Sequence, residues 1–188
     1  MSTIHANRHC DEHNAPLQES KALTSILFVC LGNICRSPLA EGVFRTVLSE
    51  RGIADIEMDS AGTGGWHAGE LPDPRSIAIG AKHSVNITDQ RARKVMAEDF
   101  ARFDLILGMD RSNVRDLLAL APKNTGGRVQ LYLDYTTGRQ KDVPDPYYGG
   151  GDGFADVYRM IRDASEKLAD KLTTGRISAA SGQASSTM

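Results

Sequence analysis

Residues 26–41 constrain the fold more than any other part of this chain. Residues 26–29 are an apolar run typical of a buried strand, residues 30–38 read Cys-Leu-Gly-Asn-Ile-Cys-Arg-Ser-Pro, and a helical pattern begins at residue 39. A strand that leads through a tight loop into a helix directs successive backbone N–H groups and the helix N-terminus towards one point. The sequence therefore predicts a site for a tetrahedral oxyanion, with the thiol of Cys30 beneath it.

The residue types in this loop suit that task. Arg36 offers a planar fork of donors that matches two phosphate oxygens, which a lysine could not imitate. Gly32 and Asn33 suit the positive φ angles that an inward-facing loop requires. The loop amides and Arg36 favour the thiolate form of Cys30, and Ser37, expected at the helix N-cap, can donate its hydroxyl to that sulfur. The predicted phosphate-binding residues are Leu31, Gly32, Asn33, Ile34, Cys35, Arg36 and Ser37.

The full string closely resembles the phosphate-binding loop of the low-molecular-weight protein tyrosine phosphatases, and the resemblance covers residues 24–172. It implies hydrolysis of phosphotyrosine in proteins, and of small aryl phosphates, through a phosphocysteine intermediate. In that family the general acid is the Asp of an Asp-Pro motif, which Asp145 matches here. Displacement of an aryl oxide needs a proton donor opposite the thiolate, and Asp142 and Asp152 are the neighbouring alternatives. The expected catalytic residues are Cys30, Arg36 and Asp145.

The resemblance also places three aromatic residues, Trp66, Tyr147 and Tyr148, on the walls of a slot for the substrate's phenyl ring. Aromatic faces suit an aromatic leaving group. Trp66 could instead anchor the core, but the glycines around it indicate a loop.

Two further residues, Ser60 and Asp110, are expected just past strand ends and behind the phosphate-binding loop. In the family, the residues that match Asn33 and Ser60 hydrogen-bond there and hold the loop in shape. One departure is that many relatives carry a histidine ahead of an Ala-Arg pair, whereas residues 88–93 here read Thr-Asp-Gln-Arg-Ala-Arg. No supporting histidine is therefore carried over to this chain.

The chain has three cysteines, Cys10, Cys30 and Cys35, which excludes an extensive disulfide framework. No histidine or further cysteine stands at zinc-ligand spacing from the loop, so no metal and no cofactor are expected. Cys35 is the predicted redox partner, because a neighbouring thiol can trap an oxidised catalytic cysteine as a reversible disulfide. The alternative for Cys35 is a small buried side chain with no redox role.

Composition and charge limit the partners. A net charge of −2 and a pI near 6.2 offer no basic footprint for nucleic acid, and no apolar run is long enough to enter a membrane. The N-terminus lacks a hydrophobic signal core, which favours a cytoplasmic protein, and a monomer is favoured. The expected partner is a protein substrate that carries phosphotyrosine.

Strand and helix patterns alternate along the chain and predict a single α/β domain. We expect a doubly wound four-stranded parallel sheet with helices on both faces and the phosphate-binding loop after the first strand. The expected strands are residues 25–29, 56–58, 103–109 and 129–133, and the expected helices are residues 37–50, 74–82, 111–120 and 154–172. The predicted organisation is a flexible extension over residues 1–22, the phosphatase domain over 23–174 and a disordered tail over 175–188.

Three other functions remain open. Arsenate reductases of related fold share a Cys-x5-Arg loop but relay electrons through further cysteines, and none follows Cys35. Protein-arginine phosphatases carry a small polar residue at the position of Ile34, where an apolar side chain suits an aryl ester better. A phosphotyrosine-binding module without catalysis would be expected to lose Cys30 or Asp145, and both are present.

Overall fold

The computed structural model describes residues 23–147 and 153–183, and in this part of the chain four strands form one parallel sheet. The strands are β1 (Ser25–Cys30), β2 (Glu57–Gly62), β3 (Leu105–Gly108) and β4 (Val129–Leu131), in the order β2-β1-β3-β4. The chain leaves β1 for β2 on one side and returns to β3 on the other. The carboxyl end of β1 therefore lies at the switch point where parallel sheets bind ligands, and the predicted doubly wound fold is confirmed.

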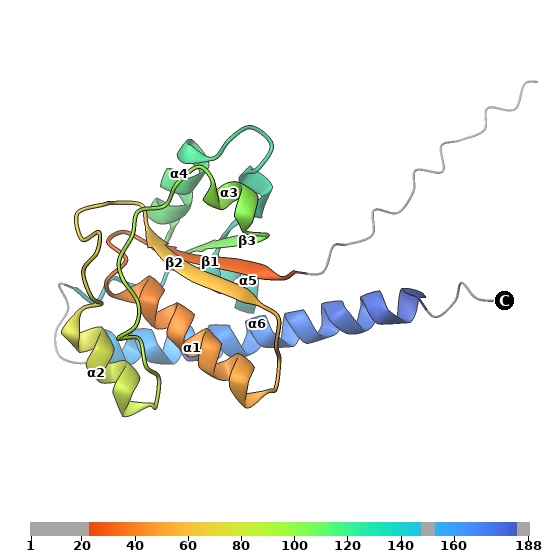
Figure 1. Cartoon of the computed structure of the whole chain (residues 1–188), viewed down its shortest axis with the longest axis horizontal. Helices are drawn as coiled ribbons and strands as arrows, with labels where there is room; N and C mark the ends of the chain where they lie inside the picture. Colours follow the sequence, from red (N-terminus) through yellow and green to blue (C-terminus); the bar gives the residue numbers. More distant parts are fainter. Residues whose placement is uncertain (1–22, 148–152, 184–188) are drawn as a thin grey trace, which may run out of the picture.

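Helices cover both faces of this sheet, as Figure 1 shows. Helices α1, α2 and α6 lie on one side, and α3 and α4 lie on the other. Their bounds, with that of the short α5, are α1 Arg36–Glu50, α2 Pro74–Lys82, α3 Asp99–Arg102, α4 Arg111–Leu120, α5 Tyr132–Thr137 and α6 Gly153–Gln183.

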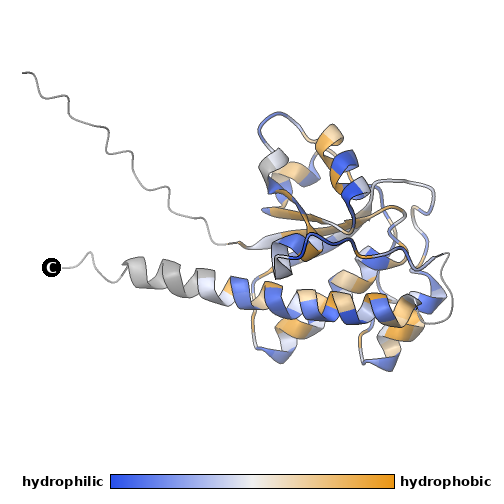
Figure 2. Cartoon of the chain, turned by 180° about the vertical axis from the view of Figure 1, so that it is seen from behind, coloured by the Kyte–Doolittle hydropathy of each residue, from blue (hydrophilic) through white to orange (hydrophobic). Residues whose placement is uncertain are grey.

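The central strand supplies both halves of the core. Ile26 and Phe28 belong to the cluster that α1 and α6 complete, whereas Leu27 and Val29 belong to the cluster on the opposite face. Successive side chains of a strand point to opposite faces, so an uninterrupted apolar run serves two layers. Figure 2 shows these hydrophobic strands enclosed between helices that carry both hydrophobic and hydrophilic residues.

Several element boundaries differ from the sequence prediction. Strand β2 runs through Ser60 to Gly62, so Ser60 lies within the strand and not past its end. The polar residues of β2 hide the strand pattern in the sequence. In the structure, six residue pairs with β1 define the strand. The fourth strand was predicted over residues 129–133 but ends at Leu131, because the chain turns into α5. Within α5 the Thr136 hydroxyl donates to the Tyr132 carbonyl at 2.7 Å, and Gly138, with a φ of 71°, follows the last residue of the helix.

Helix α6 also continues to Gln183, past residue 172, where its apolar pattern ends. It covers most of the segment 175–188 that we expected to be disordered. A nucleated helix gains one hydrogen bond for each residue that it adds, so α6 can continue past the residues that pack on the core. Residues 1–22, predicted as a flexible extension, lie outside the described residues.

Within the described residues, no helix is both long and apolar enough to cross a membrane.

Candidate active site

Cys30 is the last residue of β1, and its thiol lies at the base of the loop that leads into α1. Its carbonyl accepts a hydrogen bond from Thr63 N at 2.9 Å, which extends the pairing with β2 into the loop. Its Sγ accepts the Asn33 backbone N–H at 3.3 Å and lies 3.1 Å from the Ser37 hydroxyl. Cys30 is 3% exposed, so its sulfur is shielded from bulk solvent.

Asn33 holds the loop in shape from behind. Its φ is 56°, in the left-handed region that asparagine tolerates better than most residues. Its Nδ2 donates to Ser37 Oγ at 2.9 Å and to Ser60 Oγ at 3.0 Å, while its Oδ1 accepts the Arg93 backbone N–H at 2.9 Å. The prediction of a positive φ at Gly32 was wrong, because in the described loop only Asn33 has one. A Cβ at residue 32 would lie 3.2 Å from the ring of His67, so the glycine provides room there.

Ser37 is the second residue of α1 and does not cap the helix as predicted, since the helix begins at Arg36 and Cys35 occupies the N-cap. Its hydroxyl is buried and lies 3.1 Å from Cys30 Sγ and 3.2 Å from the Ala61 carbonyl. The hydroxyl carries one proton, which can be donated to either atom. A thiolate is the stronger acceptor, so an ionised Cys30 draws that proton to itself.

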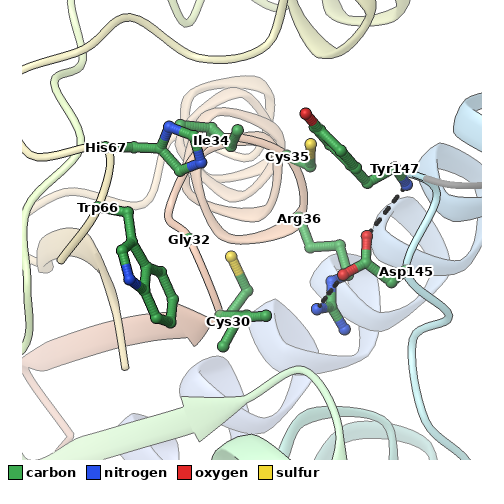
Figure 3. Close-up of a pocket in the computed structure, with 10 residues that line it drawn as sticks. Cys30, Gly32, Ile34, Cys35, Arg36, Trp66, His67, Asp145 and Tyr147 are labelled. Atoms are coloured by element: carbon green, nitrogen blue, oxygen red, sulfur yellow. Dashed lines mark hydrogen bonds and ion pairs between the residues drawn. The ribbon is translucent and has the colours of Figure 1, made fainter. Parts of the chain in front are cut away.

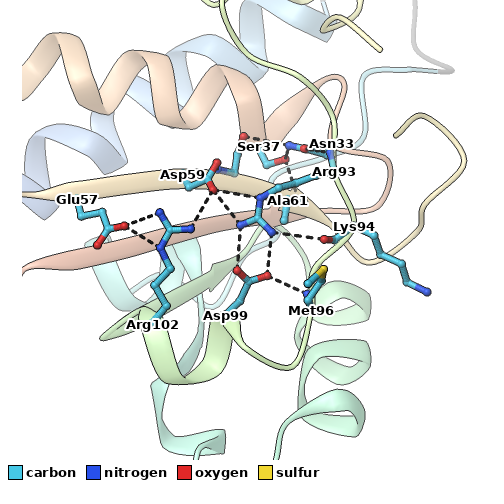
Figure 4. A network of polar contacts seen from close by, with 11 residues as sticks. Asn33, Ser37, Glu57, Asp59, Ala61, Arg93, Lys94, Met96, Asp99 and Arg102 are labelled. Atoms are coloured by element: carbon cyan, nitrogen blue, oxygen red, sulfur yellow. Dashed lines mark hydrogen bonds and ion pairs between the residues drawn. The ribbon is translucent and has the colours of Figure 1, made fainter. Parts of the chain in front are cut away.

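Figure 4 shows a network of ion pairs behind Asn33 that sequence reasoning missed. The Arg93 guanidinium donates to both Asp99 oxygens, at 2.9 and 3.1 Å, and to Asp59 at 3.1 Å. Burial acts to lower the pKa of Arg93, but Asp99 and Asp59 raise it by more than burial lowers it, so the net shift is upward. Because the side chain of Arg93 is fixed at three points, its backbone N–H stays directed at Asn33.

Arg36 is 2% exposed and is held by two carboxylates. Its Nη1 donates to Asp110 at 2.6 Å and to the Val143 carbonyl at 3.1 Å, and its Nη2 donates to Asp145 at 2.9 Å. Burial acts to lower the pKa of Arg36, but Cys30 and the two carboxylates outweigh it and raise the pKa. The guanidinium is therefore always charged, and an incoming phosphate competes with Asp145 for Nη2.

Asp110 is placed by a helix cap. It is the N-cap of α4, and its Oδ1 accepts the Asn113 backbone N–H at 2.7 Å, which leaves Oδ2 for Arg36. Of the three acidic residues that the sequence offered as general acid, Asp145 lines the pocket, whereas Asp142 pairs with Arg111 at 3.0 Å. Asp152 lies outside the described residues.

These groups surround a pocket of about 250 Å³. In Figure 3, Trp66 and His67 lie on one side of the phosphate-binding loop, and Asp145 and Tyr147 lie on the other. Trp66 is 73% exposed, which excludes the alternative of a core anchor, and Tyr147 is 42% exposed. Tyr148, the third predicted aromatic contact, lies outside the described residues. The lining residues are Cys30, Leu31, Gly32, Ile34, Cys35, Arg36, Trp66, His67, Asp145 and Tyr147.

His67 was not predicted as a site residue. Its Nδ1 lies 2.8 Å from Glu70 Oε2, three residues further along the same loop. The signal available in the sequence was its place directly after Trp66.

Cys35 is the second thiol of the pocket and is 5% exposed. Burial raises the pKa of this thiol to about 12, and the negative charges of Asp73, Cys30 and Asp145 act in the same direction while Arg75 opposes them. Cys35 is therefore a protonated thiol at neutral pH. Among the residues described, no three His, Cys, Asp or Glu side chains are grouped so that they could hold a metal ion.

A parallel α/β sheet with a thiol at the base of an amide-lined loop, a buried arginine and a carboxylate across the pocket defines the class of cysteine-dependent phosphatases. The family model described as low molecular weight phosphotyrosine protein phosphatase matches residues 25–177. The chain belongs to this family.

Comparison with individual proteins supports this family. A low molecular weight phosphotyrosine protein phosphatase of Schizosaccharomyces pombe is 46% identical over 146 residues, which cover 76% of this chain and 93% of that protein. The crystal structure of a protein tyrosine phosphatase from Entamoeba histolytica has a TM-score of 0.76 at 39% identity and covers 81% of this chain and 99% of that one. The YwlE arginine phosphatase has a TM-score of 0.75 at 23% identity, with 80% of this chain and 96% of that one covered, and it shares the fold alone.

Proposed function

We propose that this chain hydrolyses phosphotyrosine in proteins, and small aryl phosphates, through a phosphocysteine intermediate. The observation that carries the proposal is the arrangement around Cys30. Its sulfur receives the Asn33 N–H and lies beside the Ser37 hydroxyl, while Arg36 and Asp145 stand paired at the same pocket. The nucleophile, the anion-binding donors and the proton donor thus share one cavity.

In the first step, the Cys30 thiolate attacks phosphorus and a P–S bond forms as the P–O bond to the phenol breaks. Asp145, protonated for this step, gives its proton to the departing phenolate oxygen. Arg36 and the loop amides bind the equatorial phosphoryl oxygens, where charge develops. Phosphate must displace the Asp145 carboxylate from Arg36 Nη2, and this exchange leaves Asp145 free to carry the proton.

In the second step, Asp145 acts as a base towards water. The water oxygen bonds to phosphorus while its proton passes to the Asp145 carboxylate, and the P–S bond breaks to return the Cys30 thiolate and inorganic phosphate. The Ser37 hydroxyl and the Asn33 N–H stabilise the thiolate as the leaving group, because both lie within hydrogen-bonding reach of the sulfur. This chemistry uses no metal.

The walls of the pocket support an aryl ester as the substrate. Trp66, Tyr147, Leu31 and Ile34 offer apolar or aromatic surface to a phenyl ring. Ile34 has no polar group with which to receive the guanidino group of phosphoarginine, so this residue argues against an arginine phosphatase.

The test is phosphate release from matched peptides that carry phosphotyrosine, phosphoserine or phosphoarginine, with EDTA present. We expect turnover of the phosphotyrosine peptide, much slower turnover of the other two, and no effect of EDTA. Failure to turn over phosphotyrosine would refute the proposal, and faster release from phosphoarginine would favour the alternative.

We further propose that the two pocket thiols form a redox pair. Peroxide oxidises the Cys30 thiolate to a sulfenic acid, and the Cys35 thiol then attacks that sulfur, so that an S–S bond forms and water leaves. Burial raises the pKa of the Cys35 thiol to about 12, so Cys35 itself stays a protonated thiol that peroxide attacks slowly, which supports its role as the second partner. We expect mass spectrometry of the peroxide-treated protein to show a Cys30–Cys35 linkage and dithiothreitol to restore activity. Complete recovery of activity in Cys35→Ser after the same treatment would refute the pair.

We also propose that the protein is cytoplasmic and monomeric. Both described thiols, Cys30 and Cys35, are free, and a catalytic thiolate needs a reducing compartment. Cell fractionation and light scattering after gel filtration test the two statements. Recovery of the protein in an oxidising compartment, or a stable dimer at micromolar concentration, would contradict them.

A further inference from the structure

Asp145 lies in the segment of residues 143–147, which forms no helix or strand. At one end, Val143 N donates to the Met109 carbonyl at 2.8 Å, which attaches the segment to the end of β3. At the other end, Pro146 is buried and a Cβ at Gly153 would lie 3.8 Å from it. Between them, Asp145 Oδ1 accepts the Tyr147 backbone N–H at 3.0 Å, so the orientation of the carboxylate depends on the position of the Tyr147 backbone (Figure 3).

Arg75, on the first turn of α2, contacts that backbone directly. Its Nη1 donates to the Tyr147 carbonyl at 3.2 Å. Its guanidinium also lies over two aromatic rings, 5.2 Å from the centroid of Tyr147 and 4.6 Å from that of Phe154 in the first turn of α6. One planar group therefore touches the end of the acid-bearing segment and the helix that follows it.

Asp73 fixes the orientation of this guanidinium. Arg75 Nε donates to Asp73 Oδ1 at 2.9 Å and Nη2 donates to Oδ2 at 2.8 Å, a two-pronged contact that sets the plane of the group. The bond with Arg75 holds the pKa of Asp73 below its ordinary value against the opposing effect of burial, so the carboxylate stays ionised.

The same turn of α2 is bound to the loop of the nucleophile. Asp73 N donates to the Ile34 carbonyl at 2.7 Å, and Ser76 Oγ donates to the Cys35 carbonyl at 3.2 Å. A continuous chain of contacts thus runs from the phosphate-binding loop through Asp73 and Arg75 to Tyr147, whose N–H orients Asp145.

We propose that Arg75 is a positioning residue for the general acid, which sets where the Asp145 carboxyl stands relative to the oxygen of the leaving phenol. This inference rests on the proposed function. Arg75 does not touch the reacting phosphoryl group. It acts through the backbone of Tyr147, and its loss therefore affects proton transfer more than phosphate binding.

Leaving-group dependence measures that effect. The experiment compares kcat/KM for phenyl phosphate, whose phenolate is a poor leaving group, with kcat/KM for para-nitrophenyl phosphate, whose phenolate leaves readily. For Arg75→Ala we expect a loss of about 10-fold to 10²-fold on phenyl phosphate, the size of effect that misplacement by an ångström can cause. On para-nitrophenyl phosphate we expect a loss within about threefold, because that phenolate needs little protonation.

A double-mutant cycle separates positioning from a general structural role. In an Asp145→Asn background, Arg75→Ala is expected to cause no further loss on phenyl phosphate, since the proton donor is already absent. The dissociation constant for inorganic phosphate, measured by calorimetry, is expected to be unchanged by Arg75→Ala alone. Arg115→Ala is the matched control. The Arg115 side chain is 74% exposed, and within the described residues its ion pair and hydrogen bond go to neighbours on its own helix, Asp116 and Ser112.

Equal losses on both substrates, or an additive loss in the Asp145→Asn background, would overturn the proposal. If Arg75→Ala does not fold, Arg75→Lys serves instead, since it keeps a cation over the rings but cannot form the planar fork. The same non-additive pattern with a smaller loss is expected for it, and an additive pattern would again overturn the proposal. Absence of turnover by the unsubstituted protein would instead refute the proposed function, and the role of Arg75 with it.

Discussion

Replacement of Asp145 by asparagine is expected to change catalysis and phosphate binding in opposite directions. Hydrolysis of phenyl phosphate is expected to fall by about 10²–10⁴, the usual worth of general acid and base help. Phosphate affinity is expected to rise. The reason is that Asp145 occupies Arg36 Nη2 at 2.9 Å and adds a negative charge beside the anion site.

The size of the affinity gain follows from the charges around Arg36. One guanidinium faces two carboxylates, Asp110 and Asp145, so these three groups together carry a charge of −1 before phosphate enters. Asp145→Asn makes them neutral. Two unit charges about 5 Å apart interact by about 3 kcal/mol at an effective dielectric constant near 20. Because the Asp145 side chain is 38% exposed, solvent screens much of this energy, and we take about 1 kcal/mol, which is about fivefold in affinity.

The assay is titration calorimetry with inorganic phosphate, set beside kcat/KM for phenyl phosphate on the same preparations. Asp142→Asn is the matched control, because it makes the same carboxylate-to-amide change on a residue that pairs with Arg111. We expect that control to alter neither quantity by more than about twofold, as for other exposed ion pairs. Weaker phosphate binding by Asp145→Asn, or an equal loss of activity in Asp142→Asn, would refute the reasoning.

Three further substitutions test other parts of the site. Cys30→Ser is expected to abolish turnover and to retain phosphate binding in calorimetry, since the loop amides and Arg36 remain; lost binding would mean that the loop had collapsed. Arg36→Lys is expected to lower kcat/KM by about 10²–10³, because a point charge cannot make the two-pronged contact, and near-normal kcat/KM would argue against that geometry. Gly62→Ala is expected to lower the free energy of unfolding, measured in urea, by about 1–3 kcal/mol, because its Cβ would lie 2.7 Å from the Leu31 carbonyl oxygen. Its control, Gly65→Ala, is expected to be tolerated, because that Cβ would meet only the flexible side chain of Lys94, at 3.3 Å. Equal losses of stability in the two variants would contradict the predicted clash at residue 62.

Local signals determined several elements of this protein. The bounds of α2 and α4 agree with the sequence prediction, because each helix starts after an aspartate whose side chain caps it, Asp73 and Asp110. The strand, loop and helix around Cys30 were likewise readable, since an apolar run, a turn-forming segment and Pro38 follow one another within a few residues. Where local signals were weak, the prediction was incomplete, since the second strand was predicted over residues 56–58 alone and α5 was not predicted.

Sequence reasoning alone identified the residue types of the site but not the way in which they hold one another. Arg36 meets Asp110 across 74 positions and Asp145 across 109, and Asn33 meets the Arg93 backbone across 60. No local pattern encodes such pairs. They form because parallel strands end at one edge of the sheet, which brings the loops that follow them together. A charged group that is buried there is stable only where a compensating partner lies beside it. The sequence determined which chemistry the loop after β1 can perform, and only the tertiary structure decided which carboxylates, backbone groups and neighbouring helices hold that chemistry in place.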